Sequence, residues 1–182
     1  AQQGELDEVK QMIAEFIKTK DMEASQQEAQ GNAAVTKLSD HIIVYEQERG
    51  LVISFKDTLL FASASDQLTP RAQQIIQEVG KSLVGLPNYI RVEGHTDDVP
   101  INTSKFPSNW ELSALRASNV VHVLNEDVGI PAERLSIIGY GEYRPLVANE
   151  DTVSRSMNRR VDIVILKKKY DYFEPVVNQS QP

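Results

Sequence analysis

The sequence of 182 residues contains no cysteine, which excludes disulfide bonds and thiolate sites. It also lacks any apolar run near the roughly 18 residues that a membrane-spanning helix needs. Basic residues are too few for a nucleic-acid-binding face, because 19 lysines and arginines stand against 26 acidic residues, a formal net charge of −7. The polar, acidic start AQQGELDE is not typical of a signal peptide. With 41% apolar residues, the composition is that of an ordinary globular domain with some additional length.

Sequence motifs of several enzyme classes are absent as well. There is no nucleophile elbow, phosphate-binding loop or dinucleotide-binding fingerprint, since GYGEYRP at 139–145 has a different spacing and follows a strand without a helix. One cluster offers metal ligands: His95, Asp97 and Asp98 would hold a divalent cation in a hydrolytic enzyme. Alternate residues of a strand share a face, however, so His95 and Asp97 would point together and Asp98 away. We therefore expect a non-enzymatic protein without a metal or cofactor, in which His95 hydrogen-bonds the turn.

The first third of the chain differs in pattern from the remainder. Residues 5–18 have apolar side chains at helical spacing, which predicts a short amphipathic helix. The apolar positions are Leu6, Val9, Ile13 and Phe16. Residues 19–32 are polar and poor in hydrophobic anchors, which is typical of a linker that is at most partly helical. The alternative is a surface helix that packs on its own domain; otherwise compact structure begins near Ala33.

Beyond this point strand and helix patterns alternate. Turn and capping residues mark the element ends: Gly50 in the hairpin turn QERG, Thr69 ahead of Pro70, and Ser108 in the capping box SNWE. The predicted strands are 42–46, 51–55, 88–94, 134–141 and 161–166; the predicted helices are 70–83 and 109–125; 98–108 is a long loop, and 154–160 is a turn or short helix. This order predicts an α+β fold, a mixed sheet with helices packed on one face.

The helix predicted over 109–125 carries an informative pattern. At about 100° per residue, its core-facing stripe holds Trp110, Ala114, Ala117, Val121 and Leu124. One flank of that stripe holds Asn109, Ser113 and Arg116. An arginine in that position is half-buried and needs an anionic partner, for which Asp97 and Asp98 are the nearest candidates. The pattern predicts either a pocket for a ligand that carries an ammonium and a carboxylate, or an internal ion pair between strand and helix.

Four ordered segments together carry a resemblance to a known family. They are VEGHTDD at 92–98, NWELSALRASNVV at 109–121, IIGYGEYRPL at 137–146 and SRSMNRRVDIVIL at 154–166. Across residues 51–166 the chain resembles the OmpA-like peptidoglycan-binding domain. The form NWELS, the extended loop after GHTD and the preceding ERGLVISF are similar to the B subunit of the bacterial flagellar stator, of the MotB, PomB or MotS type.

The resemblance implies a site for the diaminopimelate part of a peptidoglycan stem peptide. In the family, the aspartate of GHTD and the arginine of LSxxRA grip this residue; they are Asp97 and Arg116 here. Asp97 would meet the ammonium group, and Arg116 would meet the carboxylate with two hydrogen bonds. Other positions that match motifs beside the ligand are Thr96, Asn109, Leu112, Asn158, Arg159 and Arg160. Related domains often carry an asparagine near Ser63–Ser65, so one ligand hydrogen bond is expected to be missing here or made by a serine.

The resemblance also implies an organisation and partners. Residues 1–32 would form a plug-like helix and linker, residues 33–174 the OmpA-like domain, and residues 175–182 a flexible tail. The chain would be the extracytoplasmic part of a single-pass cytoplasmic-membrane protein, meeting the stator A subunit through a transmembrane helix outside this sequence. It would bind peptidoglycan as a homodimer and anchor an ion-driven motor. Two other wall anchors stay open, a porin tail and a peptidoglycan-associated lipoprotein, although the NWELS form argues against both.

Overall fold

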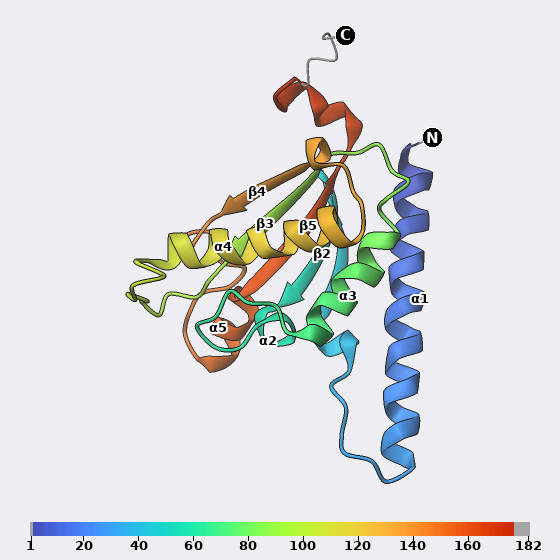
Figure 1. Ribbon diagram of the computed structural model, residues 1–182, viewed down its shortest axis with the longest axis vertical. Helices are drawn as coiled ribbons and strands as arrows, with labels where there is room; N and C mark the ends of the chain where they lie inside the picture. The colour runs from blue at the N-terminus through green and yellow to red at the C-terminus, as the bar shows by residue number, and fades with distance from the viewer. Residues whose placement is uncertain (1, 177–182) are drawn as a thin grey trace.

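The computed structural model describes residues 2–176 and centres on a five-stranded sheet (Figure 1). The strand order is β1-β2-β5-β3-β4. The strands are β1 (Ile42–Gln47), β2 (Gly50–Lys56), β3 (Ile90–His95), β4 (Leu135–Gly139) and β5 (Arg160–Leu166). β3 and β4 run parallel, and the other neighbouring pairs run antiparallel. The sheet is therefore mixed, as predicted, and the α+β class is confirmed.

The longer helices pack on one face of this sheet. In Figure 1, α3 (Pro70–Lys81) and α4 (Asn109–His122) lie in front of the strands, and α1 (Gln2–Ala29) stands alongside α3. α4 continues into a π-helical turn at Val123–Asp127, so the helix predicted over 109–125 is α-helical for most of its length. No helix within residues 2–176 is long and apolar enough to cross a membrane.

The remaining helical segments are short. They are the helices α2 (Asp57–Leu60) and α5 (Thr152–Asn158) and the 3-10 turns Leu38–Asp40, Ala132–Arg134 and Lys168–Phe173. α2 and α5 lie together at the end of the sheet where β2 points (Figure 1). Of the turn or short helix predicted over 154–160, residues 154–158 lie in α5, and Arg160 already begins β5. Residues 177–182 of the predicted tail lie outside the described residues.

Capping residues and one glycine fix the element ends as the sequence predicts. The hydroxyls of Thr69 and Ser108 each accept a hydrogen bond of 3.1 Å from a backbone N–H in the first turn of α3 and α4. In the β1–β2 hairpin, Gly50 has φ +152°, and a Cβ there would lie 1.9 Å from the carbonyl oxygen of Ile165. Only glycine fits this turn, because β5 passes directly against it.

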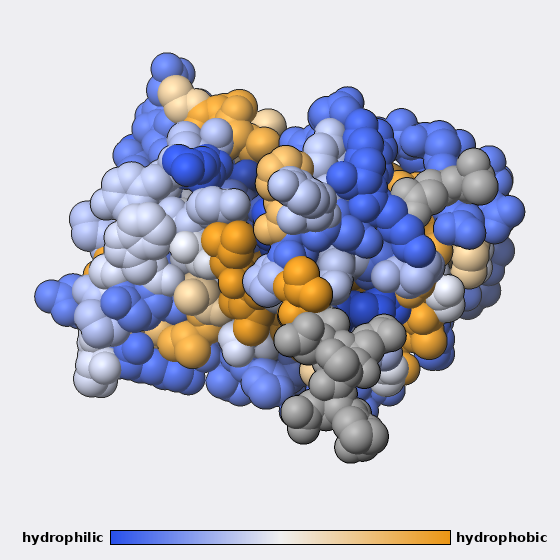
Figure 2. All heavy atoms as spheres, turned by 90° about the horizontal axis from the view of Figure 1, so that it is seen from above, coloured by the Kyte–Doolittle hydropathy of each residue, from blue (hydrophilic) through white to orange (hydrophobic). Residues whose placement is uncertain are grey.

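The main hydrophobic core lies between the sheet and the helices. Strand residues alternate between the two faces, so Leu51, Ile53 and Phe55 point into this core and Val52 points to the other face. The predicted contribution of residues 70–83 is present: Ile75, Ile76 and Val79 of α3 and Leu83 just beyond it are all buried. Outside the core, hydrophobic side chains form small separate groups in a mostly hydrophilic surface, as the end view in Figure 2 shows.

The core-facing stripe of α4 differs from the prediction. The buried residues of α4 and its π turn are Asn109, Leu112, Ser113, Arg116, Ala117, Val120, Val123 and Leu124. Trp110, which was expected to face the core, is 49% exposed. Gly94 explains the rotation, because a Cβ at this position of β3 would lie 2.0 Å from the carbonyl oxygen of Ser113. The glycine lets α4 approach β3 along the face that carries Ser113, and this turns Trp110 outward.

α1 is longer than the predicted helix and belongs to the core. It continues to Ala29, so most of the segment 19–32 that was expected to be a linker is helical. Leu6, Val9 and Ile13 are each at most 3% exposed and join the same core as the sheet. The first third therefore packs on its own domain, as the alternative interpretation had it, and compact structure begins well before Ala33.

A tertiary contact explains why the polar half of α1 stays helical. The carboxylate of Asp21 accepts hydrogen bonds from the backbone N–H groups of Leu38 (2.6 Å) and Ser39 (3.2 Å). These bonds tie the returning chain to the helix, and Ala24 is 4% exposed beneath it. Helices of this composition gain most of their stability from such contacts rather than from local propensity.

A pair of neighbouring substitutions tests the docking of α1. Ile13 is 1% exposed, whereas the adjacent Met12 is 56% exposed. Ile13→Ala should lower the free energy of unfolding by about 2–5 kcal/mol, because it leaves a cavity in the core. Met12→Ala should change it by about 0.5 kcal/mol or less. Urea denaturation followed by circular dichroism measures both, and equal effects of the two substitutions would show that α1 does not pack as described.

Candidate functional site

Strand topology brings polar residues from distant parts of the chain to one end of the sheet. β2 and β3 are both antiparallel to β5, so they end at the edge where β5 begins. Asp57 follows β2, Asp97 follows β3, and Arg159 immediately precedes β5. The first turns of α4 lie over the same edge and add Asn109 and Arg116. Opposite charges therefore meet at one site although up to about a hundred residues separate them in sequence.

These residues surround a cavity of about 340 Å³. Its lining is Asp57, Thr58, Phe61, Ser63, Ala64, Thr96, Asp97, Val99, Pro100, Ile101, Asn109, Leu112, Arg116 and Arg159. Of the residues predicted for the site, Thr96, Asp97, Asn109, Leu112, Arg116 and Arg159 are thus brought together. The long loop predicted over 98–108 forms one wall, and the segment with Ser63 forms another.

The charges in the cavity form one connected network. Arg116 Nη1 lies 3.2 Å from Asp57 Oδ2, and Arg159 Nε lies 3.3 Å from the same oxygen. Arg159 also donates through Nη1 to Asp97 Oδ2 at 2.9 Å. The expected pairing of Arg116 with Asp97 or Asp98 is wrong, because α2 places Asp57 directly beside the guanidinium. Asp98 points elsewhere and pairs with Arg155 at 2.9 Å.

Arg116 is only 3% exposed, and several contacts fix its guanidinium. Its Nε donates to the carbonyl oxygen of Ser65 at 2.8 Å, and the guanidinium lies 4.7 Å from the centre of the Phe61 ring. Burial lowers the pKa of Arg116, and the charge of Asp57 opposes this effect. For Arg159, burial also acts to lower the pKa, but hydrogen bonds and charges of Asp97 and Asp57 outweigh it and raise the pKa. Both guanidiniums therefore stay charged in the cavity wall.

Other predicted residues fix the backbone around Asp97. Thr96 Oγ1 donates to the carbonyl oxygen of Asp97 at 2.8 Å, and the Asn109 amide donates to that of Val99 at 3.1 Å. The N–H of Val99 in turn donates to Asp97 Oδ1 at 3.0 Å. Leu112 adds an apolar wall. These contacts hold the carboxylate of Asp97 at the end of β3 in one orientation.

The three residues of the motif NRR make different contacts, and only Arg159 lines the cavity. Asn158 is completely buried, and its side chain accepts from the N–H groups of Leu146 (2.8 Å) and Val147 (3.1 Å). It fastens the loop after β4 and does not line the cavity. Arg160 points to the other face of the sheet, where its Nε lies 3.1 Å from Asp162 Oδ2.

Several residues of the cavity lining were not predicted from the sequence, among them Asp57, Thr58 and Phe61. Asp57 and Phe61 line the cavity and contact Arg116. A signal for Asp57 was present, since it follows the strand predicted at 51–55 just as Asp97 follows the next strand in the chain. Where related domains carry an asparagine, Ser63 and Ala64 line the cavity, and Ala64 has φ +54°.

A protein-family comparison assigns the chain. The model of the OmpA family matches residues 60–159, which is just over half of the sequence. The chain belongs to the OmpA family. The matched range contains Asp97, Arg116 and Arg159, and it begins at the last residue of α2, so Asp57 lies just outside it.

This OmpA-family chain is similar to several wall-anchor and motility proteins. Motility protein B of Bacillus subtilis is 36% identical over 169 residues, 92% of this chain and 59% of the relative. The periplasmic domain of Helicobacter pylori MotB has a TM-score of 0.65 at 29% identity, with 73% of this chain and 86% of that chain covered. The cell wall anchor of the T6SS from Pseudomonas aeruginosa has a TM-score of 0.66 at 30% identity, with 71% and 91% covered. The resemblance to stator B subunits is confirmed, and the chain spans about three-fifths of the Bacillus relative.

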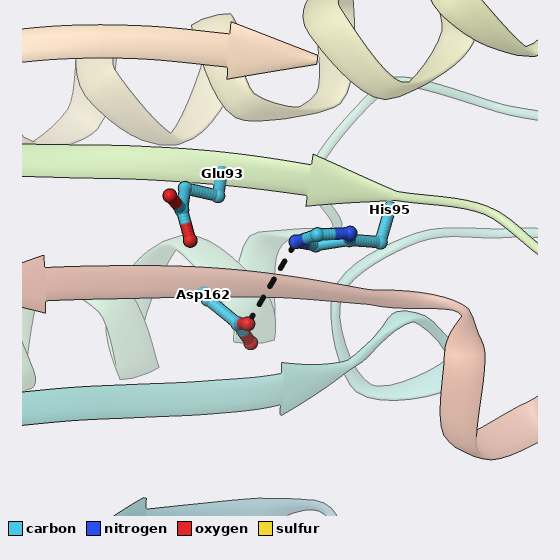
Figure 3. A group of neighbouring side chains, drawn as sticks. All are labelled: Glu93, His95 and Asp162. Carbon is cyan, nitrogen blue, oxygen red and sulfur yellow. Dashed lines mark ion pairs between the residues drawn. The ribbon is translucent and has the colours of Figure 1, made fainter. Parts of the chain in front are cut away.

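A second buried cluster lies on the face of the sheet opposite α4. Glu93 and His95 of β3 face Asp162 of β5, as Figure 3 shows. Arg49 donates to both oxygens of Glu93, at 2.6 and 2.7 Å, and Arg160 donates to Asp162. Two guanidiniums already balance the two carboxylates, so a divalent cation would have to displace an arginine. We interpret this cluster as an internal ion-pair network of the OmpA-family fold.

The residues of the hydrolase alternative do not converge on one point. β3 ends at His95, so the strand alternation that would align His95 with Asp97 does not extend that far. Asp97 pairs with Arg159, and Asp98 pairs with Arg155. Each of the three side chains therefore lies in a separate environment.

His95 packs against its neighbours instead of hydrogen-bonding the turn, which corrects the prediction. Its ring stacks on Tyr140 with centroids 5.1 Å apart, and its Nδ1 has no hydrogen-bond partner among residues 2–176. Burial lowers the pKa of His95 to about 3, and Arg160, Arg49 and Arg144 act in the same direction. The imidazole is therefore neutral in the folded protein at ordinary pH.

The lowered pKa of His95 predicts that the free energy of unfolding decreases in mild acid. An unfolded histidine titrates near pH 6.5, so between about pH 6.5 and 3 the unfolded chain binds a proton that the folded chain does not. Burial raises the pKa of Asp162, which increases the stability of the folded protein as the pH falls. The contribution of His95 is therefore measured by comparing wild type with His95→Gln. Between about pH 5.5 and 4, wild type should lose about 1.4 kcal/mol per pH unit more than the variant. Urea denaturation at several pH values measures this, and parallel curves would contradict it.

Proposed function

We propose that this domain binds peptidoglycan without catalysis and anchors a flagellar stator to the cell wall. The observation that carries the proposal is the charge pattern of the cavity: two carboxylates, Asp57 and Asp97, and two guanidiniums, Arg116 and Arg159, surround one space. Such a site matches a ligand that has an ammonium and a carboxylate on one short side chain, as diaminopimelate has. A cavity of about 340 Å³ is of a size to admit such a side chain.

Each group has a defined role in this proposal. The ligand ammonium lies against Asp97, and the ligand carboxylate lies against Arg116. Arg116 uses Nε for Ser65 and Nη1 for Asp57, and its Nη2 makes no hydrogen bond within residues 2–176. That nitrogen is available for the ligand carboxylate, with Arg159 as a second cation nearby. No histidine is among the residues that line the cavity, and the carboxylates of Asp57 and Asp97 are paired with arginines, which argues against a nucleophilic enzyme.

The relatives support the larger assembly. Motility protein B is similar over 92% of this chain and the MotB periplasmic domain over 73%, which favours a stator role on the outer side of the cytoplasmic membrane. The partner would be the stator A subunit, reached through a transmembrane segment of the complete protein. Other wall anchors are the alternative, since the T6SS anchor is similarly close. A transmembrane helix encoded directly upstream would favour the stator.

Matched aspartate variants test the cavity. Asp97 lines it and Asp98 does not, although both follow the same strand. Asp97→Asn and Arg116→Ala should each weaken binding of a diaminopimelate stem peptide by about 2–5 kcal/mol, because each leaves a charge without its partner at a buried position. Asp98→Asn should bind like wild type. Isothermal calorimetry on protein shown by circular dichroism to be folded gives these values.

Two results would contradict the proposed site. One is wild-type affinity in both Asp97→Asn and Arg116→Ala. The other is an equal loss in Asp97→Asn and Asp98→Asn, which would indicate a general effect of acidic charge. Arg116→Lys separates charge from geometry, because lysine keeps the charge but cannot present two parallel donors to a carboxylate.

We also propose that the domain acts as a homodimer. The apolar stripe of residues 5–18, one candidate for the contact, is instead buried in the protein's own core through Leu6, Val9 and Ile13. α1 still exposes Met12 and Met22, which are 56% and 55% exposed respectively. Sedimentation at several protein concentrations should show a dimer at high concentration, and a monomer at several hundred micromolar would contradict it.

A further inference from the structure

An exposed pair of aromatic rings lies beside the cavity. Trp110, in the first turn of α4, stacks on Tyr143, in the turn after β4, with ring centroids 4.9 Å apart and planes inclined by 25°. The rings are substantially open to solvent, since Trp110 is 49% and Tyr143 is 55% exposed. Trp110 directly follows Asn109, which lines the cavity. Neither residue belongs to the hydrophobic core or to the charge network, so neither of these gives a reason for two large aromatic rings at the surface.

The aromatic pair is fixed to the same elements as the cavity. The N–H of Gly141 donates to Ser113 Oγ and its carbonyl accepts from the N–H of Thr96, both at 2.9 Å. Ser113 Oγ also donates to the carbonyl oxygen of Trp110 at 3.0 Å. Gly141 has φ +59°, and a Cβ there would lie 3.6 Å from the Trp110 ring. The turn that carries Tyr143 is therefore bound to the strand end and the helix that form the cavity.

The chemistry of the pair indicates its ligand. Aromatic faces carry partial negative charge and attract the polarised C–H groups of a pyranose ring. The Trp110 indole nitrogen and the Tyr143 hydroxyl make no hydrogen bond within residues 2–176, so both can donate to sugar hydroxyls. A nucleobase would also stack on such rings, but a chain of net charge −7 disfavours a nucleic acid. We propose that Trp110 and Tyr143 bind a sugar ring of the glycan strand whose stem peptide enters the cavity.

Chain geometry supports one ligand at both places. This inference rests on the proposed function, in which the cavity holds the diaminopimelate residue. Two amino acids separate diaminopimelate from the sugar in a stem peptide, and an extended chain spans about 3.3–3.6 Å per residue. Trp110 directly follows the cavity-lining Asn109 in sequence, so the sugar and the diaminopimelate can be bound together. The pair would then distinguish glycan-linked stems from free peptides.

Two ligands that differ only in the sugar test this inference. Calorimetry would compare a diaminopimelate tripeptide with the same tripeptide linked to the N-acetylglucosamine–N-acetylmuramic acid disaccharide. Wild type should bind the sugar-linked ligand about three- to tenfold more tightly. Trp110→Ala and Tyr143→Ala should remove this preference and leave the tripeptide affinity within about twofold, which a general loss of structure would not do. Leu115→Ala, a partly exposed change on the same helix, should keep the preference.

The only tryptophan of the chain gives an independent readout. The free disaccharide, titrated to millimolar concentration, should change the fluorescence of Trp110, and Tyr143→Ala should reduce the change. If the tripeptide does not bind but the disaccharide changes the fluorescence, the cavity assignment fails and the sugar site stands. If the tripeptide binds, but wild type shows neither a sugar preference nor a fluorescence change, the sugar site is overturned and the cavity assignment stands.

Discussion

One carboxylate oxygen of Asp57 accepts hydrogen bonds from both Arg116 and Arg159, and the charge pattern of the cavity depends on it. Without this oxygen, two guanidiniums would share a largely buried space with Asp97 as their only counter-charge there, which is costly in a medium of low dielectric constant. The contact exists because the chain turns into α2 at the end of β2 instead of extending further. It joins the ends of β2 and β3, the start of β5 and helix α4 into one unit, so the site is built by topology more than by any single motif.

The burial of Arg116 could be predicted from the sequence, but its partner could not. Helical periodicity is local, so the position of Arg116 on a flank of α4 follows from a spacing of about 100° per residue. The choice between Asp57 and Asp97 depends on which strands lie side by side, and that order is set by long-range pairing. Both aspartates follow predicted strands, and only the strand order β2-β5-β3 shows that Arg159 stands between them. Asp97 was predicted from its place after a strand and from a motif that resembles a family; Asp57 lies outside that motif.

Two other differences between sequence and structure have the same origin. The apolar spacing of residues 5–18 predicted the first half of α1 correctly, but its polar second half is helical because Asp21 captures the backbone of Leu38 and Ser39. The stripe expected on α4 is rotated because Gly94 admits the helix backbone on one side. In both cases a contact between distant segments overrides a local pattern. The proposed sugar contact depends on this rotation, since it places Trp110 at the surface instead of in the core.

The adjacent residues Arg159 and Arg160 show how solvent exposure distinguishes the proposed ligand site from an internal ion-pair network. Successive positions at the start of β5 point to opposite sides, so one arginine joins Asp97 at the cavity and the other joins Asp162 behind the sheet. The two environments contain the same kinds of groups, carboxylates and guanidiniums at hydrogen-bonding distance. Behind the sheet the pairs are closed by Arg49 on Glu93, and the side chain of Glu93 is 1% exposed. At the cavity the side chain of Arg159 is 28% exposed, so the zwitterionic ligand proposed for this site would add to the existing pairs without first breaking them.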